Sequence, residues 1–124
     1  MRLFKTKSFS RFARTERITD ERLVEAVLRA EAGLVDADLG GGVIKQRISR
    51  PGQGLSGGYR VIVFYRVKER VVMVDGFAKS ALDNIDREDL KRFRALANEF
   101  LNYSEAQVRR LIEARAWTEI DYGN

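Results

Sequence analysis

The chain has 124 residues, 44% of them hydrophobic and 33% charged, which is the size and composition of one globular domain with a packed core. Its 23 lysines and arginines outnumber its 18 acids, and the net charge of +5 favours an anionic partner. Because it has no cysteine and no histidine, disulfides, thiolate or imidazole metal sites and a histidine general base are all excluded. No apolar run is long enough for a membrane span or a signal peptide, so we expect a soluble, cytoplasmic protein.

The N-terminal third predicts one strand followed by two helices. Residues 2–6 alternate polar and apolar side chains, as a short strand does. Ser8 is expected to cap a first short helix, and Thr19 a second one. The apolar residues of 23–34 recur at helical spacing, and Gly33 lies where a helix commonly ends. We expect these helices to be packing elements without a functional role.

The middle of the chain predicts three strands. Three consecutive glycines, residues 40–42, precede a strand over 43–48. Residues 49–58 form a turn-rich connection that holds the only proline. A long strand rich in β-branched and aromatic residues covers 59–67, and a tight turn leads to another strand over 71–79. This order predicts a three-stranded antiparallel meander.

Helical spacing returns in the C-terminal third. Asp86 is expected to cap a helix whose apolar residues extend to Leu101. Ser104 and Gln107 have the spacing of a capping box at the start of another helix. Residues 117–121 are expected to form a short terminal strand.

These elements together predict an α+β fold. We expect a twisted antiparallel sheet with two N-terminal helices packed on one face and C-terminal helices after it. The chain is expected to be a single domain over 1–124, made of a β-α-α-β-β-β core over 1–80 and a C-terminal helical extension over 86–124.

Positive charge is concentrated in the middle of the chain. After Ala81 the chain has nine acids against seven bases, whereas residues 39–68 contain no acid at all. The basic residues of that stretch are Lys45, Arg47, Arg50, Arg60, Arg66 and Lys68. The excess positive charge therefore belongs to the predicted sheet and its glycine-rich loop.

Some of these cations are expected to share one face of the sheet. Lys45 and Arg47 are two residues apart in a strand and so point the same way. If Arg60 and Lys79 reach that face from neighbouring strands, four cations surround a site that suits a phosphodiester. Tyr59 is the best candidate for stacking on a base or relaying a proton. The alternative is that the cations mark a solvated sheet face.

Four sequence blocks resemble the HigB-like branch of the RelE toxins. They are Asp38–Arg47, Arg50–Gly54, Ser56–Arg60 and Gly76–Lys79, within a similarity that runs from about Lys5 to about Ala97. RelE toxins are ribonucleases of type II toxin–antitoxin systems that enter the ribosomal A site on the small subunit and cut mRNA. The resemblance implies the same activity here, together with a cognate antitoxin that in this branch is usually a helix-turn-helix protein.

The resemblance also implies roles for individual residues. Lys45 matches a basic position used on the scissile phosphate, and Arg60 matches the arginine that stabilises the transition state. Lys79 lies at or beside the basic residue that closes the fourth strand. Arg47 and Arg50 are expected to contact the backbone of rRNA or mRNA, and we also place Tyr59 and Arg66 among the RNA-binding residues.

The expected chemistry needs no metal and no cofactor. The 2′-OH of the RNA attacks the adjacent phosphate, so the protein has to hold the geometry and stabilise charge. Lys45 is a conceivable general base and Lys79 a candidate to protonate the leaving 5′-oxygen. Some members of the family have a tyrosine after the fourth strand, where this chain has residues 83–85 without one, so the resemblance does not identify the base.

Three other functions are compatible with the sequence. A gyrase inhibitor of the ParE type has this fold, although such toxins generally lack the basic cluster. A module that binds RNA or the ribosome without cutting is the second alternative. A structural or scaffold protein is the third, and it predicts no salt-sensitive RNA binding.

Overall fold

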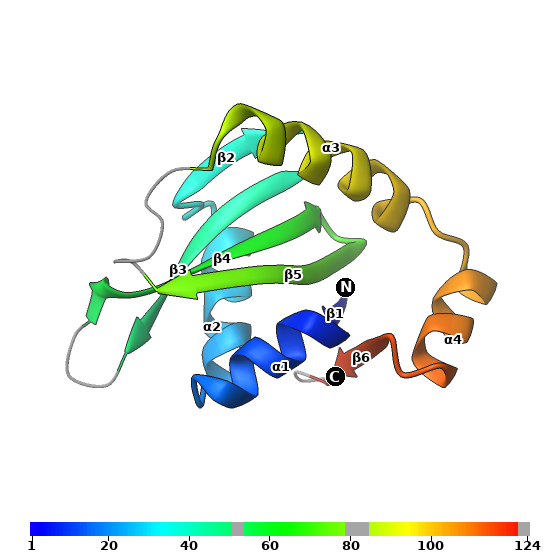
Figure 1. The fold of residues 1–124 in the computed structure, drawn as a ribbon, viewed down its shortest axis with the longest axis horizontal. Helices are drawn as coiled ribbons and strands as arrows, with labels where there is room; N and C mark the ends of the chain where they lie inside the picture. The colour runs from blue at the N-terminus through cyan, green and yellow to red at the C-terminus, as the bar shows by residue number, and fades with distance from the viewer. Residues whose placement is uncertain (51–53, 79–84, 122–124) are drawn as a thin grey trace.

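The structure, a computed structural model, describes residues 1–50, 54–78 and 85–121 (Figure 1). Within these residues one sheet has the strand order β2-β3-β4-β5-β1-β6. The strands are β1 (Arg2–Thr6), β2 (Ala37–Gly40), β3 (Val43–Arg50), β4 (Gly54–Arg66), β5 (Arg70–Ala78) and β6 (Trp117–Ile120). The helices are α1 (Lys7–Thr15), α2 (Asp20–Glu31), α3 (Arg87–Leu101) and α4 (Glu105–Glu113).

The sheet contains the predicted meander and two features that were not predicted. β3, β4 and β5 pair antiparallel in sequence order, as expected. β2 is an additional short strand on β3, and β1 pairs parallel with β5, so the sheet is mixed rather than wholly antiparallel. The terminal strand β6 is confirmed, and it lies beside β1. The C-terminal part is therefore not only helical, since it returns to complete the sheet.

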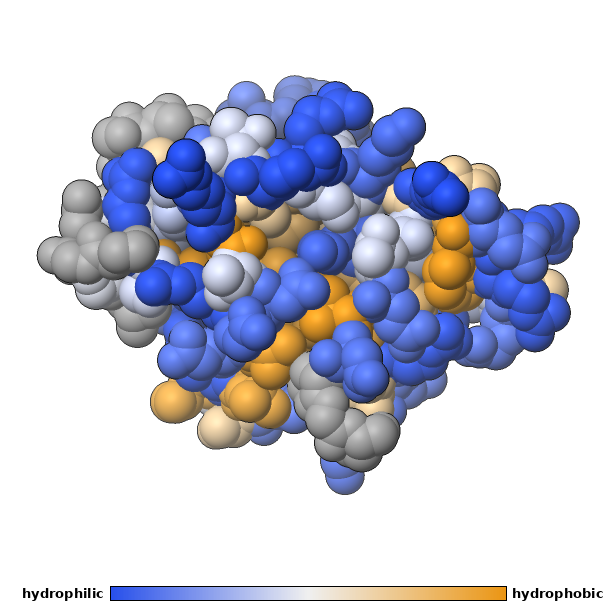
Figure 2. Space-filling model, turned by 90° about the horizontal axis from the view of Figure 1, so that it is seen from below, coloured by the Kyte–Doolittle hydropathy of each residue, from blue (hydrophilic) through white to orange (hydrophobic). Residues whose placement is uncertain are grey.

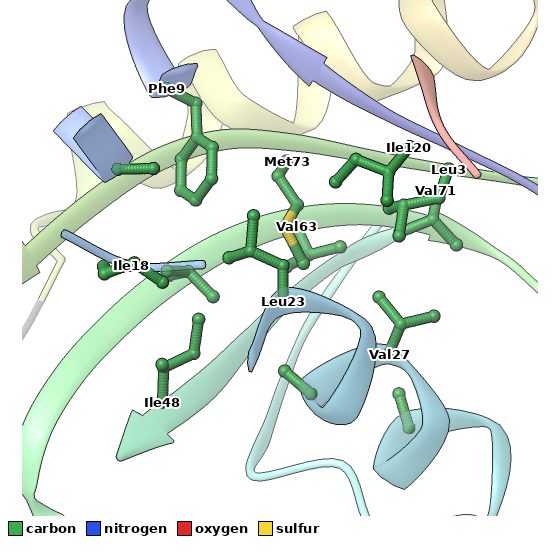
Figure 3. Packing of buried hydrophobic residues seen from close by; sticks show 14 of the residues in the cluster. Leu3, Phe9, Ile18, Leu23, Val27, Ile48, Val63, Val71, Met73 and Ile120 are labelled. Atoms are coloured by element: carbon green, nitrogen blue, oxygen red, sulfur yellow. The ribbon is translucent and has the colours of Figure 1, made fainter. Parts of the chain in front are cut away.

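One face of the sheet is covered by α1 and α2. Figure 3 shows Leu23 and Val27 of α2 directed at Val63 and the neighbouring strand residues. All the side chains drawn there belong to one buried cluster of aliphatic residues and Phe9. Burial of a large aliphatic side chain contributes about 1.5–3 kcal/mol, so this layer is a main source of stability. The prediction that the N-terminal helices pack on one face is confirmed.

The opposite face is partly covered by α3 and α4. Phe93, Ala97 and Leu101 of α3 pack on Phe64 and on the residues around it. Trp117 joins this second cluster from β6 and contacts Phe4. Helices therefore lie on both sides of the sheet, as Figure 1 shows for α3 against α1 and α2. We predicted that the cations lie on an open second face of the sheet. α3 covers part of this face, so only the remaining part is open.

The helix ends follow the expected capping chemistry with one exception. Thr19, Asp86 and Ser104 are N-caps, and Gln107 completes the capping box of α4. The cap of α1 is Thr6 rather than Ser8, because the Thr6 hydroxyl accepts a hydrogen bond from the backbone N–H of Phe9. The helix therefore begins directly at the end of β1.

The three glycines at 40–42 form the turn between β2 and β3. All three have positive φ, between 63° and 85°, which favours glycine over other residues. Arg94 of α3 lies against this turn and donates a hydrogen bond from Nε to the Leu39 carbonyl at 2.9 Å. A Cβ on Gly41 would lie 3.0 Å from the Arg94 Cγ. The glycines thus let α3 approach the edge of the sheet.

Hydrophilic and apolar residues share the face of the molecule drawn in Figure 2. Figure 2 shows one face of the molecule on which apolar residues are exposed in the middle, between hydrophilic ones. Over residues 1–50, 54–78 and 85–121, none of the helices has the length and apolar content that crossing a membrane requires. Leu28, Leu34 and Val67 are the most exposed large aliphatic residues of this part, at 49% to 62%.

Candidate functional site

A cluster of three cations, Lys45, Arg47 and Arg60, lies on the α3 side of β3 and β4. Arg47 pairs directly with Arg60 across the two strands, and Lys45 pairs with Ile62, two residues further along β4. Paired residues and residues two apart point to the same face, so the three side chains share it. Each of them is partly exposed. We call Lys45, Arg47 and Arg60 the basic cluster.

The pairing of Arg47 with Arg60 places two positively charged side chains next to each other. Side chains directly opposite in an antiparallel pair have Cβ atoms roughly 4.5–5.5 Å apart, and like charges there destabilise a sheet. An anion bound between the two guanidinium groups would offset this repulsion, since both present N–H groups in a planar fork. The arrangement therefore suits a phosphate group held over β3 and β4.

Asp36 holds one of the two arginines in place. Its Oδ1 accepts hydrogen bonds from Nε and Nη2 of Arg47 at 3.1 and 3.0 Å, and its Oδ2 accepts one from the Arg47 backbone N–H at 2.7 Å. Arg29 of α2 donates to Oδ2 as well. Burial alone would raise the pKa of the Asp36 carboxyl, but the hydrogen bonds from Arg47 and Arg29 outweigh it and lower the pKa. Asp36 is thus ionised and compensates part of the charge of the cluster.

Gln46 supports Asp36 from inside the protein. It is the one polar residue among the described residues that is buried like the core, with 1% of its surface exposed. Its Oε1 accepts a hydrogen bond from the Asp36 backbone N–H at 2.7 Å, and its Nε2 donates to the Ala26 carbonyl of α2 at 2.9 Å. Gln46 therefore fixes the segment that carries Asp36, and through it the orientation of Arg47.

Replacing Asp36 by asparagine is expected to lower the free energy of unfolding by about 1–2 kcal/mol at pH 7, because charge-assisted hydrogen bonds are lost. The folded-state pKa lies below the ordinary value of 3.8, so this contribution is present above pH 4 and is lost as the pH falls through the folded-state pKa. Urea unfolding of the native protein and of Asp36→Asn between pH 7 and pH 2 should show that the difference between their free energies of unfolding disappears in acid. The control is Glu25→Gln, at an exposed position of α2. If the difference in free energy of unfolding persists at pH 2, the ionised Asp36 carboxylate is not its cause.

Tyr59 and Arg50 lie on the other side of the sheet. Tyr59 is adjacent to Arg60 in β4 and therefore points to the opposite face, where only 4% of its surface is exposed. Its hydroxyl donates a hydrogen bond to Glu16 Oε1 at 3.0 Å, and the Arg50 guanidinium lies over its ring at 5.1 Å. Burial raises the pKa of Tyr59, and the hydrogen bond to Glu16 raises it further. The expected stacking or proton-relay role does not fit this position.

Arg66 is separated from the basic cluster along β4. It lies six residues after Arg60, roughly 20 Å along an extended strand. Its Nη1 donates hydrogen bonds to the Leu101 carbonyl at 2.9 Å and to Asn102 Oδ1 at 3.0 Å. A cation bound to the last carbonyl groups of a helix is a C-terminal cap. Arg66 therefore anchors the end of α3, and the expected RNA contact is not supported by its position.

Replacing Arg66 by alanine is expected to lower the free energy of unfolding by about 1–2 kcal/mol, because the carbonyl groups at the end of α3 lose a charged hydrogen-bond donor. Urea denaturation followed by circular dichroism measures this. Arg11→Ala removes the same charge from an exposed position of α1 and should change the stability by less than about 0.5 kcal/mol. Equal stability of the two variants would show that Arg66 is only a surface charge.

The comparison with known proteins agrees with this fold. A family model described as "RelE toxin of RelE / RelB toxin-antitoxin system" matches residues 1–120. The chain belongs to the RelE toxin family. No curated protein sequence matches it. Membership makes the chain a toxin of a toxin–antitoxin system and implies an antitoxin partner.

The structure brings together only part of the site that we predicted for this RelE family member. Lys45, Arg47 and Arg60 share a face, whereas Arg50, Tyr59 and Arg66 do not join them. Lys79, expected to complete the cluster, lies outside the described residues.

Two acidic residues of the site were not predicted. Asp36 lies outside the strands, and the spacing of its neighbours does not reveal that it binds Arg47. Asp75 of β5 shares the face of the basic cluster. Burial raises the pKa of its carboxyl, and nearby Asp89 adds to this effect, while the backbone N–H of Gly76 and the charge of Arg92 oppose it.

The RelE-type toxin also has a separate groove. This groove, of about 1040 Å³, is lined by residues including Met1, Leu28, Tyr65, Val67 and Ile120. None of the residues of the basic cluster lines it. Tyr65 points to the α2 side of the sheet, so the groove and the basic cluster are distinct features.

Proposed function

We propose that this toxin is a metal-independent endoribonuclease that cuts mRNA on the ribosome. The observation that supports it best is the pairing of Arg47 with Arg60 next to Lys45 on the part of the sheet that α3 leaves uncovered. Two forked cations and a lysine at adjacent positions suit a phosphodiester, whereas a sheet face that only meets water gains nothing from facing arginines.

The reaction requires little covalent chemistry from the protein. The 2′-oxygen forms a bond to phosphorus, its proton passes to a base, and the bond from phosphorus to the 5′-oxygen breaks. The leaving oxygen takes a proton, which leaves a cyclic 2′,3′-phosphate and a 5′-hydroxyl. Arg60 stabilises the charge that grows on the phosphorane oxygens, and Lys45 binds the scissile phosphate. Lys79 remains our candidate for the general acid.

The proposed partners follow from this activity. mRNA is cut in the A site of the small ribosomal subunit, which places the toxin in the cytoplasm. Arg47 contributes to binding of the RNA backbone, with its orientation set by Asp36. The antitoxin is proposed to be a helix-turn-helix protein, as in the HigB-like branch that the sequence resembles.

Primer extension on an mRNA translated by purified ribosomes tests the proposal. Cuts at A-site codons that appear only with the toxin, and not on the same mRNA without ribosomes, would support a ribosome-dependent nuclease. Cuts on bare RNA would support a nuclease and reject the need for the ribosome. Absence of any cut would reject the enzyme, and assays of gyrase inhibition and of ribosome binding would then distinguish the two remaining functions.

A further inference from the structure

A β-bulge in β5 places a carboxylate beside the basic cluster. In the pairing of β4 with β5, Ile62 is opposite Asp75 and Val63 is opposite Met73, so Val74 is the extra residue. Val74 packs with the core on the α3 side, and Asp75, opposite the inward-facing Ile62, points to the same side. Without the bulge, strict alternation would place these two neighbours on opposite faces.

The pairing across three strands puts Asp75 in one row with a cation. Lys45 pairs with Ile62, and Ile62 pairs with Asp75, so the backbones of the outer two are roughly 10 Å apart. Arg60 lies two residues from Ile62 and is the diagonal neighbour of Asp75, at roughly 7–8 Å between Cα atoms. A phosphodiester bound over the exposed end of Arg60 therefore has Arg47 and Lys45 of β3 on one side and Asp75 of β5 on the other.

We propose that Asp75 is the general base that accepts the proton of the attacking 2′-OH. This inference rests on the proposed nuclease function and names a residue of the same site. A carboxylate is already ionised at neutral pH, whereas a lysine ammonium has to lose a proton before it can act as a base. The carboxylate oxygen takes the 2′-proton while the 2′-oxygen bonds to phosphorus and the bond to the 5′-oxygen breaks. Solvent then removes the proton from Asp75.

The surroundings of Asp75 suit this role. Arg60 from β4 and Lys45 from β3 share its face, and Asp89 and Arg92 of α3 are the charged groups that act on it from above the sheet. Partial burial raises the pKa of its carboxyl above the ordinary 3.8, which makes it a stronger base. Its Oδ1 accepts a hydrogen bond from the Gly76 backbone N–H at 2.9 Å, which orients the carboxylate within the bulge.

The test is single-turnover cleavage of ribosome-bound mRNA by the full chain over a range of pH. Asp75→Asn keeps an oxygen for the Gly76 N–H but cannot take the proton, and it is expected to cut about 100-fold more slowly. The rate of the native toxin should fall in acid as Asp75 becomes protonated, and this fall should be absent in Asp75→Asn. Asp75→Glu should restore part of the rate.

The control is Glu88→Gln, which removes the same charge from an exposed position of α3. It should cut at nearly the native rate. The assignment of the base to Asp75 would be overturned if both variants lost the same fraction of the cleavage rate. It would also be overturned if the rate of Asp75→Asn still fell in acid. Neither result would affect the proposed nuclease function. If the native toxin itself does not cut, the proposed function fails and the role of Asp75 fails with it. Thermal unfolding of each variant confirms that folded proteins are compared.

Discussion

Replacing Arg60 by alanine is expected to slow mRNA cleavage about 1,000-fold in single-turnover experiments on ribosomes. Arg60 is the cation of the basic cluster that lies on β4, directly opposite Arg47 and diagonal to both Lys45 and Asp75. Loss of one preorganised donor to a developing oxyanion typically costs 100- to 1,000-fold in rate. The upper value is expected because the remaining cations sit on β3, on one side of the bound phosphate.

Two further variants separate chemistry from charge. Arg60→Lys keeps the charge but loses the planar fork, so it should recover only a small part of the rate. Arg109→Ala removes one charge from an exposed position of α4 and should leave cleavage unchanged. If Arg60→Ala cuts as fast as Arg109→Ala, Arg60 does not stabilise the transition state and the basic cluster serves only for binding.

Replacing Gly58 by alanine is expected to lower the free energy of unfolding by about 3 kcal/mol, which is more than a 100-fold change in the ratio of folded to unfolded protein. A Cβ at this position would overlap the carbonyl oxygen of Ile48 and lie 3.0 Å from its carbonyl carbon and 3.1 Å from the backbone nitrogen of Arg50. These are backbone atoms of β3, so they cannot rotate away. β3 and β4 would have to separate close to the pairing of Arg47 with Arg60.

Gly33 provides the matched control for this substitution. It has φ of 87° after α2, and a Cβ added there would meet no atom within 4 Å. Gly33→Ala should therefore lower the free energy of unfolding by only about 1 kcal/mol, through the strain of a positive φ in alanine. Urea denaturation of the two variants measures the difference. Equal destabilisation would mean that β3 and β4 adapt at Gly58, and the contact with Ile48 would then have no structural importance.

Most of the fold was predictable because it depends on local patterns. Within the predicted strands, residues 59–66 and 71–78 are paired, since β-branched residues and a tight turn specify a hairpin whatever lies around it. The caps Thr19, Asp86 and Ser104 each accept a hydrogen bond from a backbone N–H three residues away. The pairing of β1 with β5 depends on residues far apart in the chain, and local patterns contain no information about it.

The candidate site was only partly predictable. Strand alternation correctly placed Lys45 and Arg47 on one face, and the same rule excludes Tyr59 from the face of Arg60 because the two are adjacent. The role of Arg66 depends on where α3 ends in space, which the sequence does not show. Asp75 reaches the face through a bulge, and one extra residue in a strand leaves no clear pattern in the sequence.

The position of β1 inside the sheet has a consequence for the synthesis of this toxin. Leu3 pairs with Val71 on one side and with Ile120 on the other, so residues far apart in the chain are neighbours in the sheet. Contacts between such distant parts of a chain slow folding, and they cannot form before both parts have left the ribosome. A growing chain therefore cannot complete the contacts of β1, among them that of Phe4 with Trp117, until residue 120 has emerged. The complete sheet therefore forms only after β6 has left the ribosome.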